Sequence, residues 1–227
     1  MHLPSTQTPT GLLLSGGLDS AILLGTLVGQ RRRVQPFYVR SRLFWEPEEL
    51  RAIRRFVEAI GSPLVDELVV LELPLEDVYE GHWSLTGDKP PNASSPDDAV
   101  FLPGRNALLS IKAALWCRLN GIEELALGVL RSNPFADATP DFFDHLQAAL
   151  NCGPGPPLRI IRPFAQHDKR EVMELGREMP LKGTFSCIAP SAGLHCGQCN
   201  KCAERGLAFQ CIGLEDPTQY ATAATPD

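Results

Sequence analysis

The feature that most constrains the fold of this chain is a glycine-rich turn that directly follows its first apolar run. Residues 10–14 (Thr-Gly-Leu-Leu-Leu) predict a short strand, and residues 21–28 predict a helix. The turn between them is Ser15-Gly16-Gly17-Leu18-Asp19-Ser20. Glycines let the backbone approach a ligand closely, and successive N–H groups at the start of a helix attract anions. Strand, turn and helix together predict a phosphate-binding loop.

The spacing of this turn excludes two common nucleotide-binding loops. No Gly-Lys-Ser/Thr follows, as the nucleoside-triphosphatase loop requires, and the glycines are adjacent, unlike those of the dinucleotide fingerprint. An ordinary tight turn is the simple alternative. After a strand, however, Ser-Gly-Gly-Leu-Asp-Ser resembles the loop of the PP-loop ATP pyrophosphatases. That resemblance implies a site that holds the pyrophosphate of ATP while its α-phosphate is attacked.

Strands alternate with helices along the chain, which predicts a parallel sheet covered on both faces. Further strands are predicted at 34–39, 68–73, 124–130 and 158–162, and helices at 47–60, 106–119, 140–150 and 168–178. Pro36 weakens the second strand, because proline donates no hydrogen bond to a ladder. Residues 84–99 are turn formers almost throughout and predict a long loop, of the kind that often serves as a lid or binding loop.

Four of the seven cysteines are crowded near the C-terminus, at Cys187, Cys196, Cys199 and Cys202. Two-residue spacers let neighbouring thiolates reach one ion, and four sulfur ligands suit tetrahedral Zn²⁺. Such a site leaves no position open for water, so the predicted zinc is structural. His195 is expected beside the site without binding the metal. Buried thiols, a disulfide and an iron–sulfur cluster are the alternatives, but crowding in a reducing compartment favours a metal.

The composition fits a folded protein whose main partner is not nucleic acid. Of 227 residues, 44% are hydrophobic and 21% charged, and the formal net charge is −6. No apolar run approaches the about 18 residues of a membrane span. The first residues lack the basic-then-apolar pattern of a signal peptide. We therefore expect a cytoplasmic protein with no membrane partner.

Three further polar motifs are candidates for the same site. Arg105 and Asn106 lie in the Pro-Gly-Arg-Asn motif at 103–106, where a helix cap and a surface charge are the simple alternatives. Lys169 lies at the start of a predicted helix, where a cation opposes the helix dipole, so recruitment to an anion competes with simple solvation. Arg205 follows the cysteine cluster, which would hold its guanidinium over a phosphate unless a carboxylate pairs with it.

Taken together, these motifs resemble one family, the 7-cyano-7-deazaguanine synthases of queuosine biosynthesis. The resemblance runs from about residue 10 to residue 210. The loop alone indicates only the superfamily, whereas the loop, Pro-Gly-Arg-Asn and the cysteine spacing together are specific to this family and its relatives. The other matching positions are Gly128-Val129, Pro140-Asp141, Pro163 followed by Lys169, and Ser186-Cys187 through Cys202 to Arg205.

The resemblance implies an α/β fold and an activity. Residues 1–180 would form a Rossmann-like, adenine nucleotide alpha hydrolase-like domain with a five-stranded parallel sheet. Residues 181–227 would form a small zinc-binding segment packed on it, and the protein would usually be a homodimer. The implied enzyme is an ATP-dependent carbon–nitrogen ligase. It adenylates the carboxylate of 7-carboxy-7-deazaguanine, uses ammonia to form the amide, and dehydrates the amide to the nitrile after a second activation.

The resemblance also implies roles for residues of this chain. The expected catalytic residues are Asp19, Ser20, Arg105 and Lys169. ATP, with a bridging Mg²⁺, is expected on Ser15, Gly16, Gly17, Leu18, Asp19, Ser20, Asn106 and Arg205. The chemistry requires the protein to position the reactants and to neutralise phosphate charge.

Two segments depart from the family pattern. The family carries a Tyr-Asn-Gln-x-His-type stretch after its second strand, but residues 38–45 read Tyr-Val-Arg-Ser-Arg-Leu-Phe-Trp. Within 130–143, Phe142 and Phe143 replace a Cys-Arg pair, and the insert is longer. Both segments follow strand ends, where an α/β fold is expected to bind a base. The ATP half of the pattern is therefore intact and the substrate half is altered.

The altered segments leave two other functions open. One is a paralogue that adenylates a different carboxylate and joins it to another amine. The other is a PP-loop enzyme that modifies or thiolates tRNA. Thiolation would need a sulfur-carrying cysteine among Cys117, Cys152 and Cys211. The negative charge and the lack of a separate RNA-binding domain count against it.

Overall fold

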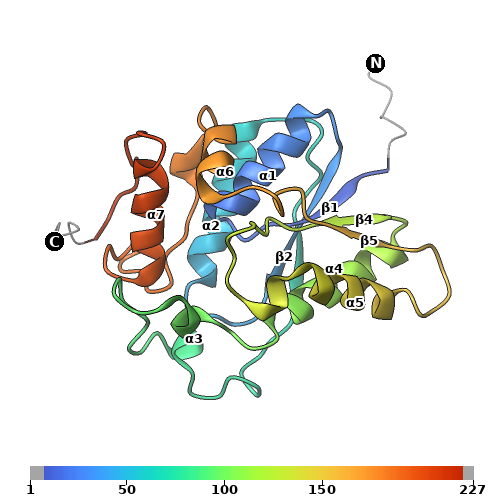
Figure 1. Cartoon of the computed structure of the whole chain (residues 1–227), viewed down its shortest axis with the longest axis horizontal. Coiled ribbons are helices and arrows are strands. Elements are labelled where there is room, and N and C mark those ends of the chain that lie inside the picture. The colour runs from blue at the N-terminus through green and yellow to red at the C-terminus, as the bar shows by residue number, and fades with distance from the viewer. Residues whose placement is uncertain (1–7, 222–227) are drawn as a thin grey trace.

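Five parallel strands form the centre of the molecule, in the order β3-β2-β1-β4-β5 (Figure 1). The computed structural model describes residues 8–221. The strands are β1 (Thr10–Leu13), β2 (Val34–Arg40), β3 (Val69–Glu72), β4 (Glu124–Ala126) and β5 (Arg159–Ile161). The chain winds outward from β1 to β3 and then returns to β4 on the other side. The direction of winding therefore reverses beside β1, where α/β sheets bind ligands.

Helices cover both faces of the sheet, as the alternating pattern predicts (Figure 1). Four of them share one hydrophobic core: α1 (Leu18–Gly29), α2 (Glu46–Ile60), α6 (Lys169–Leu175) and α7 (Asn200–Gln210). On the other face lie α4 (Arg105–Leu119) and α5 (Pro140–Leu150). Across residues 8–221, helices that combine the length and apolarity needed to cross a bilayer are absent.

The long connection before α4 is a docked segment. It contains the short helix α3 (Trp83–Thr86) and a 3-10 turn, Asp97–Val100. The backbone N–H of Ala93 donates to the carbonyl of Gln198 over 2.9 Å, and the N–H of Asn200 donates to that of Pro91 over 3.1 Å. Two further 3-10 turns occupy Ala136–Ala138 and Leu181–Gly183. The predicted loop is thus held against the C-terminal segment.

Pro36 does not interrupt β2, although this strand lies inside the sheet. The ladder between β2 and β3 begins at Phe37 and Val69, and one isolated bridge before it joins Val34 to Val65. Pro36 lies between these two pairings, where the sheet tolerates a residue that donates no hydrogen bond. The second predicted strand is therefore confirmed despite its proline.

The fourth strand is shorter than predicted. It ends at Ala126, whereas the apolar pattern predicts a strand to residue 130. Gly128 then passes over the glycine turn so closely that a Cβ on it would lie 3.2 Å from the backbone carbon of Asp19 and 3.2 Å from the nitrogen of Ser20. The predicted end is wrong because the chain leaves the sheet to pack on this turn.

Replacing Gly11 with alanine should destabilise the protein by about 1–3 kcal/mol. A Cβ there would lie 2.8 Å from Cys117 Sγ and 3.0 Å from the Phe37 ring. Gly29→Ala is the matched control, because the space around Gly29 is open and alanine favours a helix. Urea unfolding measures both variants. Equal stability of Gly11→Ala and the wild type would contradict this packing.

Candidate functional site

A cavity of about 330 Å³ lies at the carboxyl ends of β1 and β4. It is bounded by the glycine turn, α2, the start of α4, the start of α6 and the C-terminal segment. The predicted residues that line it are Ser15, Gly17, Leu18, Asp19, Ser20, Arg105, Asn106, Lys169 and Arg205. The fold therefore brings together motifs that are up to 190 residues apart in the sequence.

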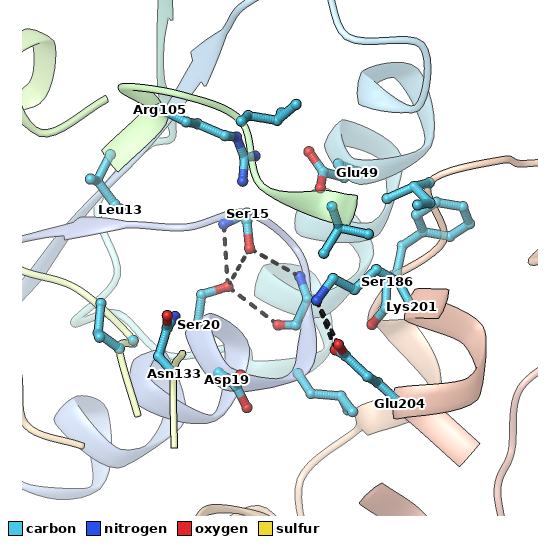
Figure 2. A pocket seen from close by; sticks show the side chains of 18 of the residues that line it. Leu13, Ser15, Asp19, Ser20, Glu49, Arg105, Asn133, Ser186, Lys201 and Glu204 are labelled. Atoms are coloured by element: carbon cyan, nitrogen blue, oxygen red, sulfur yellow. Dashed lines mark hydrogen bonds and ion pairs between the residues drawn. The ribbon is translucent and has the colours of Figure 1, made fainter. Parts of the chain in front are cut away.

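The glycine turn is fixed by its own hydroxyl groups. Ser20 Oγ accepts from the N–H of Ser15, lies 3.1 Å from Ser15 Oγ and donates to the carbonyl of Gly17 (Figure 2). Gly17 is the N-cap residue of α1, and it has no side chain that could accept hydrogen bonds from the first N–H groups of the helix. These N–H groups are thus left for an anion at the positive end of the helix.

Lys169 joins this turn through an ion pair with Asp19. Its Nζ lies 2.7 and 2.8 Å from the two carboxylate oxygens of Asp19. Both side chains are about one-third exposed to solvent. Lys169 is the first residue of α6, and its ammonium is recruited to a carboxylate instead of pointing freely into water.

Arg105 and Asn106 begin α4, after Gly104 at the cap position. Asn106 does not cap the helix. Its Nδ2 donates to the backbone and side-chain oxygens of Asp137, over 3.1 and 3.2 Å. Arg105 points its guanidinium toward Ser15, and its buried Nε has no hydrogen-bond partner within residues 8–221 (Figure 2). The cavity thus contains a cation with unused donor capacity.

Arg205 is buried, with 2% of its surface exposed. Its guanidinium donates to Thr184 Oγ1, Ser186 Oγ, Thr218 Oγ1 and the carbonyl of Leu181. Glu204 is not its partner, because Glu204 pairs with Lys201 over 2.8 Å. Burial lowers the pKa of Arg205. These bonds fix the segment from which the N–H of Phe185 donates to the carbonyl of Gly16, so Arg205 contacts the loop through this segment.

Glu49 is a cavity residue that sequence reasoning missed. It lies near the start of α2 and is only 8% exposed. Tyr38 Oη donates to Glu49 Oε2 over 2.7 Å. Burial raises the pKa of Glu49 to about 7, although the charge of Arg105 opposes this shift. Its spacing of three, four and seven from buried Ala52, Ile53 and Phe56 was the signal for a buried position.

Aromatic residues line the cavity beside Glu49. Trp45 and Trp83 stack with ring centroids 5.8 Å apart and an interplanar angle of 22°. Phe185 lies on the same cavity, and the Lys201–Glu204 ion pair lies on α7 (Figure 2). Asp19, Lys169 and this ion pair also border an adjoining hollow of about 560 Å³.

The two altered segments contribute unequally to the cavity. In the first segment, Trp45 lines the cavity, and Tyr38 donates a hydrogen bond to Glu49, the buried acid of the cavity. Phe143, in contrast, is 1% exposed and packs in the core between α4 and α5, beneath Arg162. Phe142 packs against the same core. Phe142 and Phe143 therefore do not line the cavity, whereas Asn133 of the same altered segment does.

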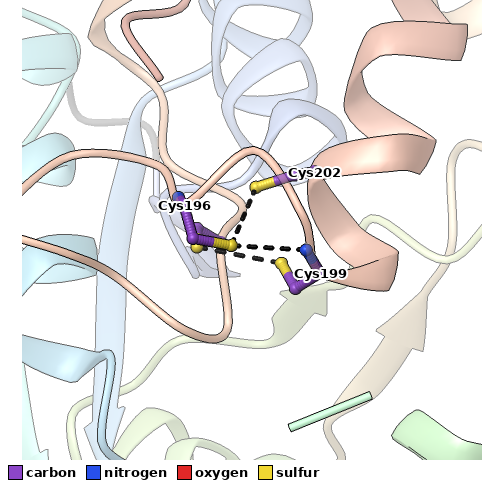
Figure 3. A group of neighbouring side chains, drawn as sticks. Cys196, Cys199 and Cys202 are labelled. Carbon is purple, nitrogen blue, oxygen red and sulfur yellow. Dashed lines mark hydrogen bonds between the residues drawn. The ribbon is translucent and has the colours of Figure 1, made fainter. Parts of the chain in front are cut away.

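The four predicted metal ligands converge (Figure 3). The sulfurs of Cys187, Cys196, Cys199 and Cys202 all lie within 4.8 Å of one another. Separations of 3.8 Å (Cys187–Cys199) and 3.9 Å (Cys196–Cys202) match the about 3.8 Å between sulfurs on tetrahedral Zn²⁺. Backbone N–H groups of 189 and 196 donate to Cys187 Sγ, and those of 198 and 199 to Cys196 Sγ. Such donors stabilise thiolates, so the residues fit zinc.

His195 lies beside this cluster and is not part of it. Its Nε2 accepts from the N–H of Ser186 over 3.1 Å, and its ring lies 4.3 Å from that of Phe185, centroid to centroid. The imidazole therefore supports the segment between the cysteines and the glycine turn.

The fold and site define an α/β protein with a five-stranded parallel sheet and a glycine turn after its first strand. A likeness to a predicted subunit of tRNA methyltransferase from Methanocaldococcus jannaschii shows this fold alone, with a TM-score of 0.50, 14% identity and coverage of 75% of each chain.

The family follows from sequence comparison. The family "Queuosine biosynthesis protein QueC" matches residues 11–213. The 7-cyano-7-deazaguanine synthase 1 of Desulfitobacterium hafniense is 33% identical, over 88% of this chain and 90% of that protein. The 7-cyano-7-deazaguanine synthase of Methanopyrus kandleri is 31% identical, over 93% and 98%. The chain belongs to the QueC family.

Replacing Cys199 with serine should lower bound zinc and the melting temperature, because a tetrahedral site loses one of its thiolates. Cys211→Ser is the control, since Cys211 is exposed and lies outside the cluster. Metal analysis and thermal unfolding measure both. Full zinc content with an unchanged melting temperature in Cys199→Ser would refute the ligand assignment.

The raised pKa of Glu49 predicts a pH dependence of stability. The folded-state pKa of about 7 lies above the ordinary glutamate value of 4.5, so the folded protein binds the proton more tightly than the unfolded chain does. The stability of the wild type relative to Glu49→Gln should therefore fall as pH rises from 4.5 through 7, by on the order of 3 kcal/mol. Urea unfolding at several pH values measures this difference. Glu58→Gln, an exposed change on the same helix, is the matched control.

Proposed function

We propose that this chain is a 7-cyano-7-deazaguanine synthase, which converts 7-carboxy-7-deazaguanine, ammonia and ATP into the nitrile. The observation that carries the proposal is the convergence of the glycine turn, the Asp19–Lys169 pair and Arg105 on one cavity in a QueC-family chain. Its curated relatives, similar over most of their length, carry that name. ATP, Mg²⁺ and ammonia belong to the same proposal.

The reaction overcomes the poor reactivity of a carboxylate. A carboxylate oxygen attacks the α-phosphorus of ATP, pyrophosphate leaves, and an acyl-adenylate forms. Ammonia adds to the acyl carbon and expels AMP, which gives the amide and releases a proton. The amide oxygen attacks a second ATP in the same way. Loss of that oxygen with AMP, and of the remaining N–H protons, leaves the nitrile.

The glycine turn and Lys169 supply the charge stabilisation that this chemistry needs. The free N–H groups of α1 face phosphate oxygens at the positive end of the helix. Asp19 would hold Mg²⁺, which would neutralise phosphate charge when bound. Lys169 pairs with Asp19 over 2.7 Å, so its ammonium lies beside the same turn and would add positive charge for the phosphates.

Replacing Asp19 with asparagine should lower pyrophosphate release at least about a hundred-fold, because the variant loses both the metal carboxylate and the partner that positions Lys169. The assay contains ATP, Mg²⁺, 7-carboxy-7-deazaguanine and ammonium, and mass spectrometry identifies the product. Asp144→Asn, an exposed change on α5, should leave the rate unchanged.

Pyrophosphate release at the wild-type rate in Asp19→Asn would refute the role of the turn. A folded, zinc-loaded wild type that binds ATP but releases no pyrophosphate with this acid would refute the substrate. The ATP-binding half of the site would then serve a different carboxylate, as the altered segments allow.

A further inference from the structure

We propose that Glu49 and Arg105 form the edge of the cavity that reads a guanine-type base, with the Glu49 carboxylate accepting hydrogen bonds from the ring N1–H and the exocyclic amino group. The inference rests on the proposed function and deepens it, because it assigns the residues that recognise the purine-like part of the acid.

The two residues lie where a base would be when phosphates occupy the glycine turn. In Figure 2, Glu49 and Arg105 lie on one side of Ser15, and Asp19 lies on the other. All four line the same cavity. A molecule with its carboxylate near the turn would therefore extend its ring toward Glu49.

Glu49 has the acceptor capacity for this role. Above its pKa of about 7, the Glu49 carboxylate is ionised and offers about four acceptor positions. Tyr38 Oη uses one of them at 2.7 Å. This donor holds the carboxylate in one orientation and leaves acceptor positions open toward the cavity, which Glu49 lines. A buried carboxylate with unused acceptors strongly favours a ligand that brings two N–H donors.

Arg105 supplies the complementary half of the edge. A guanine-type ring places its two donors beside the O6 acceptor, and in the 7-carboxy acid the carboxylate is next to O6. Arg105 lies close enough to lower the pKa of Glu49 by its charge, and its buried Nε has no partner among the described residues. The Glu49 carboxylate would thus face the two ring donors, and the Arg105 guanidinium beside it would face the O6 acceptor.

The walls of the cavity suit a flat aromatic ring. Trp45, Trp83 and Phe185 line it together with Leu102 and Leu109. Aromatic stacking favours a base of any identity, because every base has a π-face. Selectivity therefore has to come from the polar edge, where Glu49 is the buried acid.

The test compares two bases that differ only in the exocyclic amino group. Calorimetric titration at a pH of about 8.5, where Glu49 is ionised, measures binding of 7-deazaguanine and of 7-deazahypoxanthine to the full chain. The wild type should bind the former about ten- to hundred-fold more tightly, since a hydrogen bond to a charged acceptor is lost with the latter. Glu49→Gln should bind both weakly and equally, because an amide cannot accept from two adjacent donors with both atoms. Glu58→Gln, on the same helix, should keep the wild-type preference.

Equal affinity of the wild type for both bases, no binding of either, or an unchanged preference in Glu49→Gln would each overturn the inference. Melting temperature and ATP binding show whether Glu49→Gln is folded, and if it is not, the wild-type comparison alone decides. Failure of the proposed function has a different signature. In that case the preference for the amino base remains, but 7-carboxy-7-deazaguanine yields no pyrophosphate.

Discussion

The site depends on the backbone of Gly16, which two parts of the molecule contact at once. Its φ of +81° and the carbonyl of Glu49, 3.0 Å from where a Cβ would lie, admit only glycine. Its own carbonyl accepts from the N–H of Phe185 over 2.7 Å. The turn is thus held between α2 and the cysteine-bearing segment. The open N–H groups of α1 and the position of Asp19 follow from that clamp.

Two cations of the cavity are paired with acids of the chain. Lys169 contacts Asp19, and Lys201 contacts Glu204. Arg105 differs, because its buried Nε has no hydrogen-bond partner among the described residues, although its charge acts on Glu49. Pairing lowers the cost of keeping three cations close together in a partly buried space. An entering anion would therefore compete with acids of the chain at the two lysines and would find unused donor capacity at Arg105.

Features set by neighbouring residues could be predicted from the sequence. The glycine turn, the cysteine spacing and the alternation of strands with helices are all local, and the structure contains each of them. Features set by distant contacts could not. The early end of β4 depends on Gly128 meeting Asp19, and the position of Phe143 depends on the packing of α4 on α5. Glu49 was missed because an acidic side chain is rarely buried, so its helical spacing from buried apolar residues was passed over.

The segment between β3 and α4 is held in place by the start of α7 and the residues before it, about 100 residues further along the chain. It is bonded to Gln198 and Asn200, next to the thiolates, and it contributes Trp83 and Leu102 to the cavity. The four cysteines and this wall of the cavity are therefore held by the same short stretch of the C-terminal segment. A change that displaces this stretch would move both, so the cysteine cluster and the cavity share one support.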